Sequence, residues 1–312
     1  MTRRWPDQPG DTEVLDLFRN LKVWKKGDQR APHKPLLVLM ALARLQGGGE
    51  RLWSFEDINP LLHELLVEFG PGDRKSVHPE YPFWYLRNDG VWEVPDAATL
   101  ARRVAHRKRS KDIPKGVLLE MKAQAGFPPE LDALLRTRPD LVNRIAALLL
   151  DAHFPRSVHE DILDAVAFPW VVEPRFRRAR DPAFRERILR IYERRCAVCG
   201  YDGRMGRAEL GLEAAHIKWH CHSGPDTEDN GLALCLFHHR ALDRGALGID
   251  QDHTLMVSQH AIGSVGLPDW LHRYAGRPLR TPVPGGARPH EDHISWHQRE
   301  VFKSPARLAT SP

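Results

Sequence analysis

The chain has 312 residues, of which 42% are hydrophobic, so it is long and apolar enough for two domains with cores of their own and is not a disordered polymer. Its longest apolar run, Pro35 to Ala43, is far shorter than the roughly 18 residues that a membrane span requires, and its first residues do not read as a secretion signal. Four cysteines are too few for a disulfide framework. We therefore expect a cytoplasmic protein with reduced thiols and no membrane partner. The net charge of +5 favours a polyanionic partner.

The first half of the sequence predicts a mainly helical domain. Apolar residues recur at helical spacing in VLDLFRNL, PLLVLMALARL, INPLLHELLVEF and LVNRIAALLLDAHF. One segment differs: residues 81–94, YPFWYLRNDGVWEV, alternate aromatic and polar residues around Asn88-Asp89-Gly90, which predicts a β-hairpin. The first basic cluster, ARRVAHRKRSKDIPK, follows shortly after it.

A change in pattern divides the chain. Between Pro155 and Arg180 the periodicity weakens and prolines appear, so we expect a domain of residues 1–155, a linker of residues 156–180 and a second domain of residues 181–312. The second basic cluster, RFRRARDPAFRERILRIYERR, leads into the second domain through a helix that begins near Asp181.

Two short-spaced ligand pairs in the second domain predict a structural zinc site. Cys196 and Cys199 form a Cys-x-x-Cys pair, and Cys235 and His238 form a Cys-x-x-His pair at a domain-sized interval. Each pair can occupy one edge of a tetrahedron, as structural zinc requires. Cys221 lies outside this pairing and could replace His238 as the fourth ligand.

The residues between the two zinc pairs resemble the HNH nuclease family. GLEAAHIKWH is followed by DNGLALC and then by the adjacent pair His238-His239. The resemblance implies a ββα-metal fold in which His216 is the general base, working near neutral pH as imidazoles do. It also implies that Asn230 holds the strand of the base in place through backbone hydrogen bonds. His239 would be a ligand of one catalytic divalent cation, Mg²⁺ or Mn²⁺, for phosphodiester cleavage.

The sequence departs from the common family pattern at Ala215, where many members have a metal-binding Asp or His. Asp243, one helical turn beyond His239, is our candidate for the second protein ligand of the cation. The alternative is that Asp243 is a structural helix residue paired with Arg240 or Arg244.

The first domain contains two motifs, PHKPL and YPFWYL, that resemble the sulfur-binding domain of phosphorothioate-dependent restriction endonucleases of the McrA type. The resemblance spans most of the chain and implies a pocket for the sulfur lined by His33, Lys34, Tyr81 and Pro82. Tyr85 stands where some members have a small residue, so the floor of the pocket can differ. An apolar wall beside positive charge suits a sulfur that replaces a non-bridging phosphate oxygen.

The basic cluster after residue 100 supplies candidates for contacts to the bases. Arg107 is the first candidate for a bidentate contact to guanine, followed by Arg103 and Arg109. The alternative is that this run contacts phosphates without sequence preference.

These observations predict an α+β protein with an N-terminal reader of modified DNA and a C-terminal ββα-metal domain with a zinc knuckle. The predicted function is restriction of phosphorothioated double-stranded DNA. A homodimer is expected, because cutting both strands needs two active sites or two visits. One alternative is a reader of methylated cytosine, with Tyr81, Trp84 and Tyr85 as an aromatic cage. The other is a DNA-binding module without catalytic activity.

Overall fold

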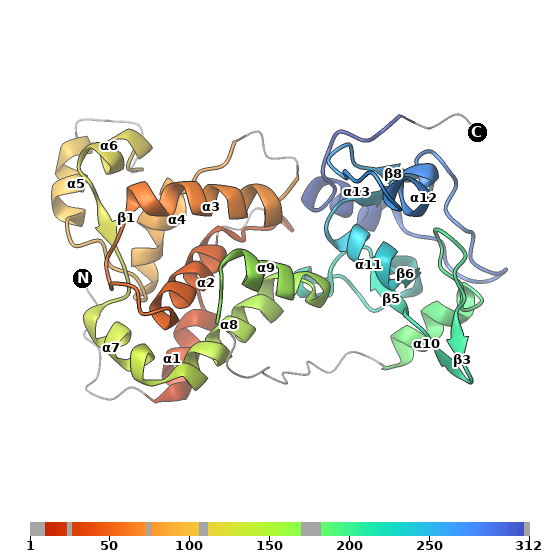
Figure 1. Cartoon of the computed structure of the whole chain (residues 1–312), viewed down its shortest axis with the longest axis horizontal. Coiled ribbons are helices and arrows are strands. Elements are labelled where there is room, and N and C mark those ends of the chain that lie inside the picture. The colour runs from red at the N-terminus through yellow and green to blue at the C-terminus, as the bar shows by residue number, and fades with distance from the viewer. Residues whose placement is uncertain (1–9, 24–26, 73–75, 106–111, 170–181, 309–312) are drawn as a thin grey trace.

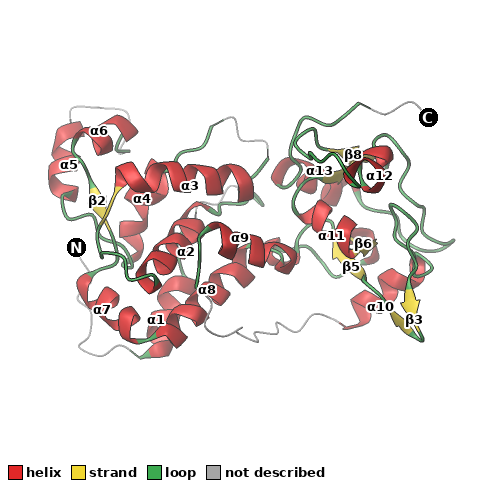
Figure 2. Ribbon diagram, in the orientation of Figure 1, coloured by secondary structure: helices red, strands yellow, loops and turns green. Residues whose placement is uncertain are grey.

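The computed structural model describes residues 10–23, 27–72, 76–105, 112–169 and 182–308. These residues form two units that lie beside each other along the longest axis of the molecule (Figure 1). The first unit is almost wholly helical, whereas the second combines short helices with β-hairpins (Figure 2). The α+β class is thereby confirmed. No helix in the described ranges is long and apolar enough to cross a membrane.

The helical unit contains most of the long helices. Its elements in chain order are α1 (Asp11–Arg19), α2 (His33–Gln46), β1 (Trp53–Ser54), α3 (Phe55–Phe69), α4 (Glu80–Tyr85), the 3-10 helix η1 (Leu86–Asp89), α5 (Ala97–Val104), α6 (Lys115–Glu120), β2 (Gln124–Ala125), α7 (Pro129–Thr137), α8 (Pro139–His153), η2 (Arg156–Val158) and α9 (His159–Ala165).

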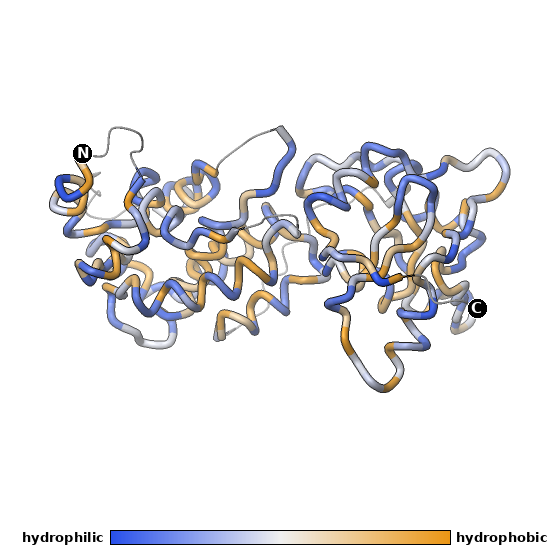
Figure 3. Tube along the Cα trace, turned by 90° about the horizontal axis from the view of Figure 1, so that it is seen from above, coloured by the Kyte–Doolittle hydropathy of each residue, from blue (hydrophilic) through white to orange (hydrophobic). Residues whose placement is uncertain are grey.

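Helix α2 is the centre of this unit because its sequence is apolar on all sides. Residues 35–43 of α2 are all buried, as expected of a helix surrounded by others. The helix ends before Gly47, the first of three consecutive glycines. Helix α3 begins where Ser54 accepts a hydrogen bond from the Asp57 amide at 3.1 Å. The surrounding helices alternate between hydrophobic and hydrophilic stretches along the chain, as amphipathic helices do (Figure 3).

The β-hairpin predicted for residues 81–94 is wrong. These residues form α4 and η1, and only Val91 to Val94 continue as extended chain with a single bridge, from Glu93 to Gly126. Three consecutive residues are buried: Pro82, Phe83 and Trp84. A short helix surrounded by the core can bury consecutive side chains, whereas a strand with one buried face buries only every second one. Gly90 has φ of 77°, so Asn88-Asp89-Gly90 ends a 3-10 helix rather than reversing a hairpin. The strand pair of this unit that the structure describes is β1 with β2.

The core of the helical unit continues beyond residue 155. Elements η2 and α9 lie in the segment expected to be a linker, and their side chains Val158, Ile162 and Leu163 join the same apolar cluster as α2 and α8. The cluster ends at Phe168, just before the residues outside the described ranges.

The second unit is built around a ββα arrangement. Its elements are α10 (Pro182–Ile191), β3 (Arg204–Met205), β4 (Ala208–Glu209), β5 (Leu212–His216), η3 (His220–His222), η4 (Glu228–Asn230), β6 (Gly231–Cys235), α11 (Leu236–Asp243), β7 (Leu247–Ile249), β8 (Leu255–Val257), α12 (Leu267–Trp270), η5 (His272–Tyr274) and α13 (Glu291–Glu300). Strands β5 and β6 are antiparallel, with Leu212 opposite Cys235 and His216 opposite Gly231.

Helix α10 packs closely on the β5–β6 hairpin, as the surroundings of Gly231 show. A Cβ added at Gly231 would lie 2.2 Å from Cδ1 of Ile188, so a larger residue there would require the Ile188 side chain of α10 to shift. The result is that the end of β5 and the start of β6 are fixed against α10.

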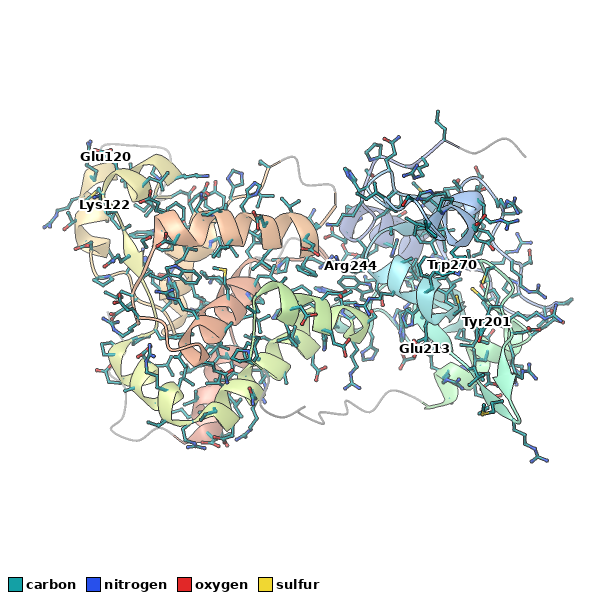
Figure 4. All side chains as sticks on the ribbon, viewed as in Figure 1. Glu120, Lys122, Tyr201, Glu213, Arg244 and Trp270 are labelled. Carbon is teal, nitrogen blue, oxygen red and sulfur yellow. The ribbon has the colours of Figure 1, made fainter. Side chains whose placement is uncertain are left out.

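Polar contacts join the two units. Arg30, which is 2% exposed, donates to the backbone oxygens of Glu300 and Phe69, both at 2.7 Å, and its guanidinium lies 4.1 Å from the ring centroid of Trp219. Arg244 lies at the boundary between the units (Figure 4), where it pairs with Glu68 at 2.5 Å.

Candidate functional site

The four predicted zinc ligands lie together. One donor atom from each of Cys196, Cys199, Cys235 and His238 lies within 4.8 Å of all the others, and this is the one such cluster in the described part of the chain. The first two cysteines stand in a tight turn, Cys235 ends β6, and His238 is in the first turn of α11. Cys221 is outside the cluster, so the alternative in which it replaces His238 is wrong.

Hydrogen bonds orient this cluster. Nε2 of His238 donates to the backbone oxygen of Trp270 at 2.8 Å, which leaves Nδ1 directed at Sγ of Cys235, 3.1 Å away. A metal-binding histidine usually makes such a bond with its other nitrogen. Trp270 and Tyr201 both lie farther from the helical unit than Arg244 does (Figure 4), so the cluster lies away from the contact between the units.

The thiols and the imidazole of the cluster shift one another's pKa values. Hydrogen bonds from Cys199 and Cys235 lower the pKa of the Cys196 thiol, whereas hydrogen bonds with Cys196 and Cys199 raise the pKa of Cys235. Burial disfavours the charged form of His238, but Cys196 and Cys199 outweigh it and raise its pKa to about 9. Without a metal ion, the neighbouring groups therefore oppose the ionisation of the Cys235 thiol. A bound Zn²⁺ would neutralise the thiolates, and a Cys₃His donor set fits that ion.

His216 stands at the end of β5, where two neighbours fix its ring. The ring stacks on Phe184 of α10 with centroids 4.2 Å apart and planes inclined by 14°. Its Nε2 lies 2.7 Å from Oδ1 of Asp226, and the side chain is 11% exposed. Because a carboxylate accepts at Nε2, the neutral ring carries its hydrogen there and its lone pair on Nδ1. Sequence reasoning missed Asp226, which lies in the loop between β5 and β6.

Asn230 closes that loop. Its Oδ1 accepts from the Lys218 amide at 2.8 Å, and its Nδ2 donates to the oxygens of Lys218 and Pro225 at 3.0 and 2.9 Å. The side chain of Asn230 is fully buried. It therefore holds together the loop that follows His216 and carries Asp226.

His239 lies between two carboxylates. Its Nδ1 is 2.7 Å from Oε2 of Glu213, and its Nε2 is 3.2 Å from Oδ2 of Asp243. Burial opposes the charged form, but the two carboxylates outweigh it and raise the pKa of His239 to about 9. Two oxygen donors beside an imidazole are a donor set that suits Mg²⁺ or Mn²⁺. Glu213, which is near the lower edge of the ββα unit in Figure 4, was not singled out in the sequence.

A cavity of about 80 Å³ connects these residues. His216, His239 and Asp243 line it from the second unit, and Phe154 and Ser157 line it from the helical unit. The Ser157 hydroxyl donates to Oδ2 of Asp243, and His222 bonds the backbone oxygen of His153 at 3.2 Å. The ion pairs of Asp243 with Arg240 or Arg244, which were the alternative to a metal-binding role, do not form, since both arginines contact Asp161.

A second and larger cavity, of about 1040 Å³, brings the predicted sulfur-pocket residues together. It is lined by His33, Lys34, Tyr81, Pro82 and Tyr85, among others. The start of α2 supplies the first two and α4 supplies the other three. We call this space the reading cavity.

Hydrogen bonds fix the polar side chains of the reading cavity. The Lys34 ammonium pairs with Asp89 and donates to the backbone oxygen of Lys22 at 2.8 Å. The ring of Tyr81 stacks on that of His78 at 4.9 Å. Tyr85 donates to Asp112, and burial together with that carboxylate raises the Tyr85 pKa to about 12, so its hydroxyl remains a donor.

Of the arginines predicted to contact the bases, the structure describes Arg103, which does not line the reading cavity. Arg103 is on α5 and pairs with Glu120 at 3.3 Å, at the outer end of the helical unit (Figure 4). Arg107 and Arg109 lie outside the described residues. Two residues that sequence reasoning missed, Arg299 and Glu300 at the end of α13, line the reading cavity from the second unit.

The fold and these two cavities define a protein with a helical DNA-reading unit and a nuclease-type ββα unit. A family description of the ScoMcrA-like DNA sulfur-binding domain matches residues 11–169, and that of an HNH endonuclease matches residues 196–250. Because the first match spans about half of the sequence, the chain belongs to the ScoMcrA-like DNA sulfur-binding family, and its HNH domain is of the endonuclease type.

Solved structures resemble the chain more weakly. The sulfur-binding domain of ScoMcrA with phosphorothioated DNA is 22% identical, with a TM-score of 0.42, over 49% of this chain and 96% of that one. The corresponding SprMcrA complex is 19% identical, with a TM-score of 0.41, over 53% and 98%. The type IV phosphorothioation-dependent endonuclease ScoMcrA is 20% identical, with a TM-score of 0.41, over 59% of this chain and 34% of that one. No curated protein matches the chain.

Proposed function

We propose that the protein is a type IV-like restriction endonuclease that recognises phosphorothioate-modified double-stranded DNA and hydrolyses its phosphodiester bonds. The observation that carries this proposal is that one chain has a reading cavity lined by His33, Lys34, Tyr81 and Pro82 and a ββα unit with His216, Asn230 and His239. The family to which the chain belongs and its HNH domain support the same conclusion.

The reading cavity has the chemistry that a phosphorothioate needs. Sulfur is larger and more polarisable than oxygen, so it gains dispersion contacts from the Pro82 ring and from the face of Tyr81. The Lys34 ammonium, which is 12% exposed, neutralises part of the remaining charge. A methyl-cytosine cage is disfavoured, because Trp84 is only 3% exposed and Arg87 covers its ring at 4.0 Å.

The ββα unit carries the groups for hydrolysis. Nδ1 of His216 takes a proton from water, whose oxygen attacks phosphorus as the bond to the 3′ oxygen breaks, which leaves a 5′ phosphate. Asp226 holds the His216 ring in the required tautomer and stabilises the imidazolium that forms. His239 and Asp243, with Glu213 beside them, would hold a divalent cation, which when bound neutralises charge on the scissile phosphate and the leaving oxygen.

The proposal includes a structural Zn²⁺ at the Cys₃His cluster. It also includes a homodimer, because one nuclease site cuts one strand of the DNA. The domain boundaries proposed from the sequence place the reader in residues 1–155 and the nuclease in residues 181–312, although helix α9 and the family match both continue the reader to residue 165 or beyond.

A cleavage assay tests the proposed function. The full chain is incubated, in Mg²⁺ and separately in Mn²⁺, with one plasmid in three forms that are unmodified, cytosine-methylated and phosphorothioated. We expect cleavage of the phosphorothioated form only, because a preference for sulfur must come from the reading cavity. Equal cleavage of all three forms would show that the protein does not recognise the phosphorothioate. Cleavage of the methylated form alone would show that it recognises methylated cytosine instead.

A substitution in the reading cavity separates sulfur recognition from general DNA binding. Tyr81 is 42% exposed, so Tyr81→Ser removes an apolar wall without opening the core. We expect affinity for phosphorothioated duplex to fall about tenfold, in keeping with the 1 to 3 kcal/mol that a small apolar contact supplies. Binding to plain duplex should hardly change. Lys34→Gln is the comparison, because losing a charge should weaken both complexes; a Tyr81→Ser variant that weakens both equally contradicts the assignment.

A further inference from the structure

The reading cavity is completed by the nuclease unit. Arg299 and Glu300, the last two residues of α13, line it together with Lys34 of α2. They are separated from Lys34 by more than half of the sequence, so neither motif of the first domain indicates that they belong to this site.

The end of α13 is anchored on the loop that leads into α2. Oε2 of Glu300 accepts from the Arg30 amide at 2.9 Å, and the Arg30 guanidinium donates to the backbone oxygen of Glu300 at 2.7 Å. Nε1 of Trp296, one turn earlier in α13, donates to the backbone oxygen of Asp28 at 2.9 Å. Because Arg30 is only three residues before His33, where α2 begins, these bonds fix α13 relative to the sulfur-pocket residues.

The Arg299 guanidinium is held but not enclosed. Its Nη2 contacts Asp28 at 2.9 Å and its Nε contacts Oε1 of Glu300 at 2.9 Å. The side chain remains 39% exposed, whereas that of Glu300 is 3% exposed. A guanidinium has five N–H donors, so it can keep both carboxylate contacts and still donate to a further anion. Asp28 is 47% exposed but does not line the reading cavity, so Arg299 is the exposed charge of this cluster at the cavity.

We propose that Arg299 of the nuclease unit contacts the phosphate backbone of DNA seated in the reading cavity, so that reading is shared between the two units. This inference rests on the proposed function, because it takes the reading cavity as the DNA site. A backbone strand carries one negative charge for each nucleotide, and an arginine beside the apolar pocket can hold a phosphate next to the marked one. The contact carries no sequence information, so it should strengthen binding to plain and phosphorothioated duplexes alike.

The experiment uses the full chain with His216→Ala, without added divalent cation, so that DNA is bound and not cut. The probes are plain duplexes and a pool of duplexes that carry one phosphorothioate in every dinucleotide context. Affinity is measured by fluorescence anisotropy over a series of salt concentrations. Arg299→Gln keeps a hydrogen-bonding side chain and removes the charge. We expect it to weaken both complexes about tenfold near 0.1 M salt and to lower the slope of log Kd against log salt by about 1.

Two matched variants separate a DNA contact from a structural role. Arg273→Gln makes the same change at an exposed arginine of the second unit that does not line the reading cavity, and it should leave affinity and slope nearly unchanged. Asp28→Asn removes the carboxylate partner of Arg299 and of Lys218, and it should bind DNA at least as tightly as the parent. If Asp28→Asn weakens binding as much as Arg299→Gln, or if Arg299→Gln behaves like Arg273→Gln, the proposal is overturned. Failure of the proposed function would appear separately, as equal affinity of the parent for plain and phosphorothioated duplexes.

Discussion

Replacing His216 by alanine is expected to lower the rate of DNA cleavage by about 10²- to 10⁴-fold, the contribution typical of a positioned general base. The ring stacks on Phe184, bonds Asp226 and lines a small cavity, and it belongs to neither apolar cluster, so its loss should disturb neither core. DNA affinity and zinc content should remain those of the parent. The measurement is single-turnover cleavage of phosphorothioated DNA, with binding and zinc analysis on the same preparation.

Two further variants show whether the loss comes from the proton transfer. Asp226→Asn keeps a polar group at Nε2 but favours the wrong tautomer, so cleavage should fall by about 10- to 100-fold, which is less than for His216→Ala. His272→Ala changes a histidine that bonds the backbone oxygen of Ala261, away from the catalytic cavity, and should cleave normally. Near-normal cleavage by His216→Ala would contradict its role as the base.

Replacing Cys235 by alanine is expected to release the zinc and unfold the second unit. Structural zinc contributes on the order of 10 kcal/mol to small zinc-binding folds, which is comparable with the whole stability of a domain. Cys235 is also the residue at which β6 ends and α11 begins, so the metal joins both elements to the Cys196 turn. The measurements are elemental analysis of the purified protein and thermal unfolding.

Cys221→Ala is the control for this variant, because Cys221 lies outside the cluster and packs near Trp219 and Trp296. It should retain the zinc content of the parent. A folded parent protein with less than about half an equivalent of zinc, or a Cys235→Ala variant that keeps its metal, would show that the cluster is not a structural zinc site.

The zinc cluster could be predicted from sequence because its spacing is local, whereas the ββα unit is expected from the resemblance to HNH nucleases. Cys196 and Cys199 must lie in one turn, and His239 and Asp243 must lie on one face of a helix that begins after β6. The position of Asp243 beside His239 followed from that periodicity. Glu213 could have been found in the same way, since α11 packs against β5 and a carboxylate on that strand can reach the helix.

The remaining contacts depend on how segments distant in sequence meet. Asp226 is in an irregular loop, where no periodicity tells which side chain turns toward His216. Ser157 and Arg299 each reach a cavity of the other unit, and no pattern in one unit indicates what the other presents to it. The hairpin prediction failed for a related reason, because burial of Phe83 and Trp84 in the common core outweighed the β-propensity of aromatic residues.

The way the two units meet has a consequence for the cooperativity of the molecule. In the described residues each apolar cluster belongs to one unit alone, and the units are joined by ion pairs, hydrogen bonds and cation–π contacts such as those of Arg30 and Arg244. Such an interface resembles a transient protein–protein contact and weakens as ionic strength rises. Separating the two units would expose neither apolar core. It would break the buried contacts of Arg30 and Glu300, so the cost of moving the reader relative to the nuclease lies in polar groups and not in apolar surface.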